Sequence, residues 1–122
     1  MKAHPVLAVL KTAAEGLIFT SETDAELEPF VWGVRHAPTP KRLAKLSQRG
    51  DDPPIEKLEL AAFFRAVPKS EKAKFAALAK VLEANLTDIE VYKVGEVNLV
   101  VFIVGKTKDG KWAGLRTEVV ET

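Results

Sequence analysis

The sequence predicts an α+β protein, arranged as a three-layer α-β-α sandwich with a mainly antiparallel central sheet. The first observation is segment 97–104, which is apolar on both sides of a strand apart from Asn98. Such a strand needs cover on both faces, and helices are the available cover. The second observation is Asp109-Gly110, which is typical of a type I′ hairpin turn and predicts a return strand over 111–120. This return strand is only half apolar, so we expect it nearer an edge of the sheet than its partner.

The first third of the chain predicts one helix followed by short extended segments. A helix is expected over 5–15, because apolar residues recur at helical spacing between an initial proline and a glycine just past the end. The apolar run 17–19 leads into the polar cluster 20–24, which we expect to be an exposed turn. A second extended segment is expected over 27–32.

The middle of the chain predicts a basic helix that begins at 38–40. Leu43 and Leu46 are expected to face the core. The outward face of this helix is expected to carry four basic side chains: Lys41, Arg42, Lys45 and Arg49. Residues 50–54 form a loop by composition, and 55–67 fits an extended segment as well as a helix.

The longest helix is expected over about 71–86, with Ser70 as its N-cap. A strand over 90–94 follows, and residues 95–96 interrupt the apolar pattern before segment 97–104. The last third of the chain is therefore expected to consist of strands joined by tight turns.

Composition favours a single domain, 1–122, of a soluble cytoplasmic protein. The 122 residues are 47% hydrophobic and 29% charged, which is ordinary for a globular domain. Eighteen basic and seventeen acidic residues leave a net charge of +1, which argues against general nucleic-acid binding. No apolar run approaches the ~20 residues that span a membrane, and the start is a poor signal peptide. We expect the free protein to be a monomer.

The sequence contains no recognisable catalytic constellation, so we expect a protein that is not an enzyme and carries no cofactor of its own. It has no cysteine, which excludes disulfides, thiolate catalysis and zinc–cysteine sites. The triplet Gly105-Lys106-Thr107 lacks the upstream glycine of a phosphate-binding loop and leads into a hairpin instead of a helix. Asp51-Asp52 could bind a cation, but a solvated loop before two prolines explains this pair better.

Two groups of side chains are candidates for binding. The basic helix face defined above could contact phosphates, although the balanced net charge favours an ordinary solvated face. Trp32 and Trp112 could anchor a protein interface, where tryptophan is over-represented. Partial burial in the core explains both tryptophans equally well.

The last residue of the sequence is a further candidate. Thr122 closely follows the predicted return strand and presents a hydroxyl and a carboxylate near the carboxylate of Glu121. These are hard oxygen donors, which Mg²⁺ and Ca²⁺ prefer. Because Mg²⁺ commonly keeps several waters, such a group could replace one water on a metal held by a partner protein. On residue types alone, an ordinary chain end is the simpler explanation.

Three stretches carry a resemblance to a known family. They are Gly16-Leu17-Ile18-Phe19-Thr20-Ser21-Glu22, then Phe63-Phe64-Arg65-Ala66, and a run from Val91-Tyr92-Lys93-Val94-Gly95-Glu96-Val97 through Gly105, Gly110 and Ala113-Gly114 to Val119-Val120-Glu121-Thr122. They resemble the nuclease A inhibitor family, whose members block a sugar-nonspecific, magnesium-dependent nuclease. The likeness covers nearly the whole chain. The final ~32 residues are its most specific part, because glycines, hairpin and terminal threonine match in order and spacing.

The resemblance implies an α-β-α sandwich, in agreement with the two-sided strand. It also implies that Thr122 is a ligand to the catalytic magnesium of the nuclease, so that this metal belongs to the partner. Glu22, in the Ser21-Glu22 turn, would reach the same active site. The implied function is stoichiometric inhibition of a nuclease. Glu121 and Trp112 are further candidate contacts with it.

The chain departs from the family between the Phe-Phe element and the long helix. The family's inhibitor has a longer, acidic, tryptophan-bearing segment there, whereas residues 67–72 of this chain are few, basic-leaning and without tryptophan. This departure supports an alternative, a non-enzymatic binding or regulatory domain of the same fold with a different partner.

Overall fold

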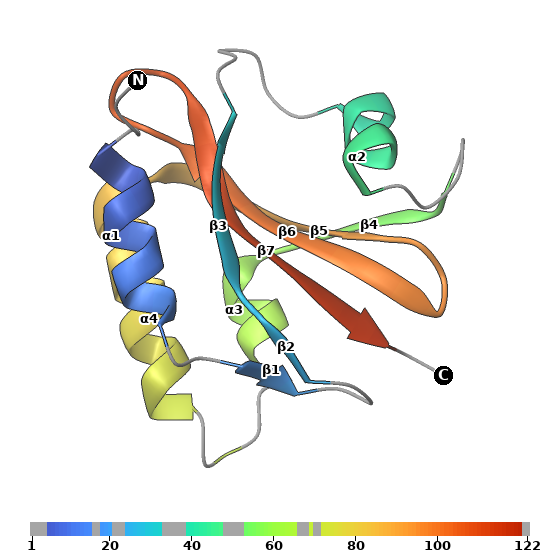
Figure 1. Ribbon diagram of the computed structural model, residues 1–122, viewed down its shortest axis with the longest axis horizontal. Helices are drawn as coiled ribbons and strands as arrows, with labels where there is room; N and C mark the ends of the chain where they lie inside the picture. Colours follow the sequence, from blue (N-terminus) through green and yellow to red (C-terminus); the bar gives the residue numbers. More distant parts are fainter. Residues whose placement is uncertain are drawn as a thin grey trace.

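The computed structural model describes residues 5–15, 18–20, 24–32, 39–47, 53–65, 69 and 72–120. Within these ranges the chain forms four helices and seven strands (Figure 1). The helices are α1 (Pro5–Ala14), α2 (Pro40–Ser47), α3 (Leu60–Phe64) and α4 (Lys72–Asn85). The strands are β1 (Ile18–Thr20), β2 (Asp24–Glu26), β3 (Glu28–Trp32), β4 (Ile55–Leu58), β5 (Thr87–Val94), β6 (Asn98–Lys106) and β7 (Trp112–Val120).

Five strands form one sheet in the order β3-β7-β6-β5-β4, and each neighbouring pair is antiparallel. β1 and β2 form a separate two-stranded antiparallel sheet. The predicted α+β class and antiparallel sheet are therefore confirmed. β7 lies nearer an edge than β6, as its half-apolar pattern predicts.

The strands near the start of the chain are more numerous than predicted. The apolar run 17–19 corresponds to β1 and the segment 27–32 to β3. The expected turn at 20–24 is narrower, because Thr20 and Asp24 are paired strand residues and 21–23 lie outside the described residues. β2 was not predicted, since Asp-Ala-Glu has little β propensity.

β6 is the central strand and is buried on both faces. Every residue from 99 to 105 is buried. Alternate side chains enter two separate clusters, Leu99, Val101 and Ile103 in one and Val100, Phe102 and Val104 in the other. The two-sided strand predicted over 97–104 is confirmed from Asn98 onward, whereas Val97, expected on one apolar face, lies in the turn before β6 and is 48% exposed.

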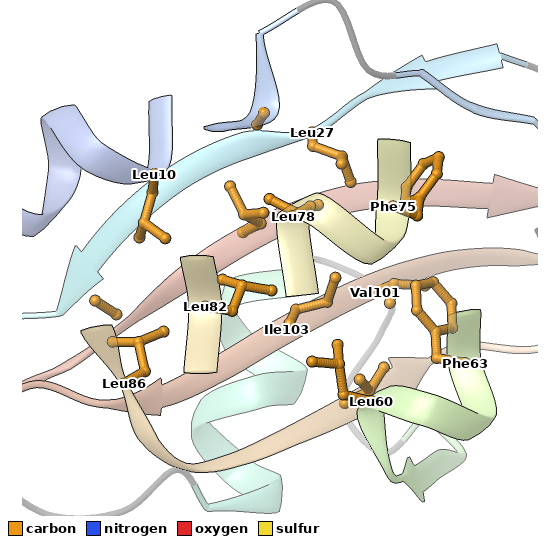
Figure 2. Packing of buried hydrophobic residues seen from close by; sticks show 14 of the residues in the cluster. Leu10, Leu27, Leu60, Phe63, Phe75, Leu78, Leu82, Leu86, Val101 and Ile103 are labelled. Carbon is orange, nitrogen blue, oxygen red and sulfur yellow. The ribbon is translucent and has the colours of Figure 1, made fainter. Parts of the chain in front are cut away.

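Helices α1, α3 and α4 cover one face of the sheet and build what we call the three-helix cluster (Figure 2). Leu78 and Leu82 of α4 are fully buried and point toward Ile103 of β6. Leu10 of α1 and Phe63 of α3 belong to the same cluster. Fully burying one such side chain contributes about 1.5–3 kcal/mol, so this cluster is the main core.

The opposite face carries a smaller cluster under α2, which we call the aromatic cluster. Its buried members are Trp32, Leu43, Val94, Val100, Phe102 and Val104. Phe30 stacks on Trp32 with ring centroids 4.8 Å apart, and Phe102 meets Phe30 edge-on at 6.1 Å. Leu43 is contributed by α2, which Figure 1 shows across the sheet from α1 and α4. Both faces of the sheet therefore receive helical side chains.

The buried face of α2 differs from the predicted one. Leu43 is buried as predicted, whereas Leu46 is 37% exposed. The face turned toward the sheet consists of Leu43, Ala44 and Ser47. The Ser47 hydroxyl is satisfied within the helix, because it donates to the Ala44 carbonyl at 2.9 Å. The prediction for Leu46 is wrong because two small side chains let α2 approach the sheet on their side, which turns Leu46 outward.

The ambiguous segment 55–67 contains both a strand and a helix. β4 pairs with β5, and α3 begins only two residues after β4 ends. Both interpretations left open by the sequence are therefore correct for different halves of the segment. Ser70, the predicted N-cap of the long helix, lies outside the described residues.

The β6–β7 hairpin closes with a three-residue loop instead of the predicted type I′ turn. The Thr107 N–H donates to the Lys111 carbonyl at 2.7 Å, and the Gly110 N–H donates to the Thr107 carbonyl at 3.0 Å. Gly110 has φ of +86°, while Asp109 does not have the positive φ that type I′ requires. The Thr107 hydroxyl stabilises the three-residue loop, since it donates to the Asp109 carboxylate and accepts from the Lys111 N–H.

The outer edges of the sheet are short and irregular. β3 contains Pro29, which has no N–H to donate to a further strand. β4 has four residues, and its two central side chains, Glu56 and Lys57, are exposed and charged.

Gly114 of β7 lies against the backbone of β6. A Cβ at this position would overlap the Ile103 carbonyl oxygen and lie 3.0 Å from the Val104 Cα. We expect Gly114→Ala to force the strands apart and to lower the free energy of unfolding by about 3 kcal/mol or more. Urea unfolding followed by tryptophan fluorescence measures this change. The control is Gly110→Asn, since asparagine tolerates a left-handed φ. That variant should lose less than about 1 kcal/mol.

Burial raises the pKa of Tyr92 to about 12, helped by a 2.7 Å hydrogen bond from its hydroxyl to the Glu90 carboxylate and by that negative charge. The folded pKa lies above the usual value of 10.0, so the stabilisation from the neutral hydroxyl is complete below pH 10 and is lost toward pH 12. Between about pH 9 and about pH 11.5, the melting temperature of Tyr92→Phe should therefore fall less than that of the unmodified chain. Thermal unfolding at each pH measures this difference. Lysine deprotonation affects both proteins equally. Parallel pH profiles would contradict the assignment.

Candidate functional site

The end of β7 is held in register against β6. Asn98 pairs with Val120 and Leu99 pairs with Val119, which is buried in the three-helix cluster. The backbone is thus fixed to within two residues of Thr122, as predicted. Thr122 itself and Glu121 lie outside the described residues.

The small β1–β2 sheet lies beside the same part of β7. β3 pairs with β7 as far as Glu28, which lies opposite Arg116. β2 precedes β3 by one residue, and both strands of the small sheet contact β7 (Figure 1). Because β3 occupies β7 up to Arg116, the small sheet lies along the remaining part, toward Val120.

Ser21 and Glu22, the other main predicted contacts, lie outside the described residues. The residues that precede and follow this segment, Thr20 and Asp24, are paired ends of β1 and β2. The strands that lead to Glu22 and the strand that leads to Thr122 therefore belong to the same end of the molecule, which we call the β7 end.

An ion-paired arginine lies on the face of the sheet that carries the aromatic cluster, at the β7 end. Arg116 lies between the carboxylates of Glu28 and Glu118, with nitrogen–oxygen distances of 3.9 and 4.0 Å. These two acidic side chains are 70% and 56% exposed, so each pair contributes little to stability. Both carboxylates remain accessible beside the last residues of β7.

Trp112 lies at the opposite end of β7 from Val120. The strand has nine residues, so its two ends are roughly 26 Å apart at ~3.3 Å per residue. Trp112 is half-buried against the aromatic cluster, and its indole Nε1 is buried without a hydrogen-bond partner. Trp32 is only 8% exposed. Burial supports the core interpretation for both tryptophans. The length of β7 separates Trp112 from the β7 end.

The predicted basic face of α2 is only partly free to contact phosphates. Lys41 and Lys45 are exposed. The Arg42 guanidinium lies over the Trp32 ring, 5.3 Å from its centroid, and its Nε is buried without a hydrogen-bond partner. Arg49 lies outside the described residues. Arg42 is therefore part of the packing of α2, which weakens the nucleic-acid interpretation further.

The described surface also has hollows away from these residues. One of about 600 Å³ lies between the end of α4 and the β6–β7 hairpin, lined by 83–88 and 106–110. Another of about 330 Å³ lies between α3 and α4, with Phe64 and Phe75 among its apolar lining residues. No group of three or more His, Cys, Asp or Glu side chains in the described ranges could hold a metal ion. None of the described helices is long and apolar enough to cross a membrane.

Two features of the β7 end were missed from the sequence. β2 has no propensity signal and owes its strand structure to pairing with β1. Arg116 and Glu118 carried a usable signal, because residues two apart in a strand share a face and oppositely charged neighbours pair.

A family model described as nuclease A inhibitor-like protein matches residues 4–122, nearly the whole chain. No protein with curated annotation matches the chain.

The contact between Arg42 and Trp32 predicts an asymmetric response to substitution. Arg42→Lys keeps the charge but loses the planar stacking group, and we expect it to lower the free energy of unfolding by about 1 kcal/mol. Lys45→Arg on the exposed side of α2 is the matched control and should change stability by less than about 0.5 kcal/mol. Chemical unfolding monitored by tryptophan fluorescence tests both. Equal stabilities of the two variants would show that the stacking is unimportant.

Proposed function

Because this chain belongs to the nuclease A inhibitor-like family, we propose that it is a protein inhibitor of a magnesium-dependent, sugar-nonspecific DNA/RNA nuclease. The observation that carries the proposal is the family match over 4–122. The family is one of inhibitors, which makes a non-enzymatic role plausible. The convergence of β7 and the β1–β2 sheet supports a single contact end.

In the proposed mechanism, Thr122 coordinates the catalytic magnesium of the nuclease. Its hydroxyl and carboxylate oxygens are ligands of the type that magnesium prefers, and the metal belongs to the partner. Glu22, with Ser21 beside it, enters the same active site, and Glu121 adds a negative charge next to the metal. The inhibitor thus occupies a coordination position that substrate phosphate or water would otherwise fill.

The end of a paired strand is a suitable position for such a ligand, because a metal ligand must be held in place by a rigid backbone. Val119 is buried and the ladder continues to Val120, so the backbone is held to within two residues of the proposed ligand. We also infer that the domain is the three-layer α-β-α sandwich of this family. The burial of Leu43 of α2 against the face opposite α1, α3 and α4 supports this arrangement.

One observation favours a second function, a binding or regulatory domain of the same fold with a different partner. The link between α3 and α4 is only seven residues long, from Phe64 to Lys72, and lacks the acidic, tryptophan-bearing segment of the family's inhibitor. Arg65 is the first residue of this link and Lys72 directly follows it, and both line the apolar hollow between the helices. A partner that binds this side of the domain would differ from the family's usual nuclease.

Removal of Thr122 tests the proposed mechanism. We expect deletion of this residue to weaken inhibition of a magnesium-dependent nuclease by at least about thirtyfold, because a charge-assisted metal contact is lost. Extending the chain beyond Thr122 with a short tag should have the same effect, since the carboxylate moves away from the metal. Inhibition constants from a DNA-cleavage assay measure both variants.

The matched control carries the same tag at residue 1 and should inhibit as the unmodified chain does. Circular dichroism should show all variants folded, because the last core residue described is Val119 and the strand ladder ends at Val120. Undiminished inhibition after deletion would eliminate the role of Thr122. If the unmodified chain inhibits no nuclease from its own source while binding another protein there, the second function is correct.

A further inference from the structure

The turn between β5 and β6 presents an apolar side chain to solvent. Val97 is 48% exposed, more than the other large hydrophobic side chains in the described ranges that are exposed, Val9 at 39% and Leu46 at 37%. Its neighbours Glu96 and Asn98 are also exposed. About half of this side chain is therefore left uncovered by its own domain.

The backbone holds this turn in a fixed conformation. Gly95 has φ of +120°, and a Cβ there would lie 2.8 Å from the Asn98 carbonyl oxygen. The Gly95 N–H donates to the Pro54 carbonyl at 2.9 Å, which ties the turn to the segment before β4. Val97 is therefore carried on a rigid support and is presented at little cost in conformational entropy.

The register of the sheet places the turn beside the β7 end. Asn98 pairs with Val120, so the residues that precede Asn98 extend from β6 in the same direction in which β7 continues past Val120. Figure 1 shows the β5–β6 turn next to the end of β7 and on the side of the molecule away from α1. We propose that Val97 is an apolar contact with the partner nuclease, adjacent to the metal-coordinating end of the inhibitor. This inference rests on the proposed function.

The charges around Val97 fit an enzyme that binds nucleic acid. A nuclease must attract phosphates, so the rim of its active-site cleft carries positive potential. The exposed carboxylates of Glu96 and Glu118 lie on the turn and on the neighbouring strand β7. Glu96 adjoins Val97 in the chain and Glu118 lies opposite Val100, so the exposed valine has negative charge on both strands near it, complementary to a basic rim.

A pair of valine-to-lysine variants tests the proposal. Val97→Lys replaces the apolar contact with a positive charge that faces the basic rim of the nuclease, and we expect it to raise the inhibition constant by at least about thirtyfold. Val97→Ala removes two methyl groups without adding charge and should raise it by about three- to tenfold. Val9→Lys on α1 is the matched control, with a similar exposure on the opposite side of the molecule, and should leave inhibition unchanged.

The outcomes separate this inference from the proposed function. If the unmodified chain inhibits and deletion of Thr122 abolishes inhibition, while Val97→Lys inhibits normally, the contact at Val97 is overturned and the nuclease mechanism stands. If Val97→Lys and Val9→Lys weaken inhibition equally, the effect is not local and the inference also fails. Thermal unfolding of the three variants verifies that each is folded, and Val97→Ala keeps the test valid if Val97→Lys unfolds.

Discussion

The two-sided burial of β6 is the constraint on which the remaining structure depends. A strand with apolar side chains on both faces cannot lie at an edge or against solvent, so it requires a strand on each side and helical cover above and below. β5 and β7 are the neighbouring strands, and the side chains of the two clusters cover the two faces. The three-helix cluster is the larger of the two, and the aromatic cluster compensates with ring contacts around Trp32 and Phe102.

The same constraint determines where a binding group can be placed. β7 is paired with β3 as far as Arg116 and with β6 as far as Val120. Its direction is therefore fixed by two ladders and its end by the ladder with β6, not by side-chain contacts at the surface. The β5–β6 turn is fixed in the same way, because β6 begins opposite the residue at which β7 ends. A surface built from strand ends and turns of one sheet can therefore be rigid without contributing to the core.

The sequence was sufficient for features that depend on long apolar patterns. The two-sided pattern of 97–104, the helical stripe of α4 and the half-apolar pattern of β7 each predicted the observed position in the fold. Features decided by a single local competition were not predictable. Ala44 and Ser47, and not Leu46, are buried on the face of α2 that is turned toward the sheet. The hydrogen bonds of the Thr107 hydroxyl accompany a three-residue loop in place of the expected type I′ turn. At the candidate site, the sequence identified Thr122 and Glu22 by resemblance, but not the neighbouring β2, Arg116 or Val97, whose positions depend on strand pairing.

Pro29 in β3 has a consequence for the behaviour of the protein at high concentration. An open five-stranded sheet has two edges, and each can in principle recruit the same edge of another copy and begin a growing ribbon. A second copy added to β3 would meet a position without a donor, and a carbonyl of the incoming strand would be left unpaired. At β4, pairing with a second copy would require Glu56 and Lys57, which are exposed and charged, to lose water. Both edges thus disfavour strand-by-strand polymerisation, which leaves the ends of the strands as the part of the sheet open to a foreign protein.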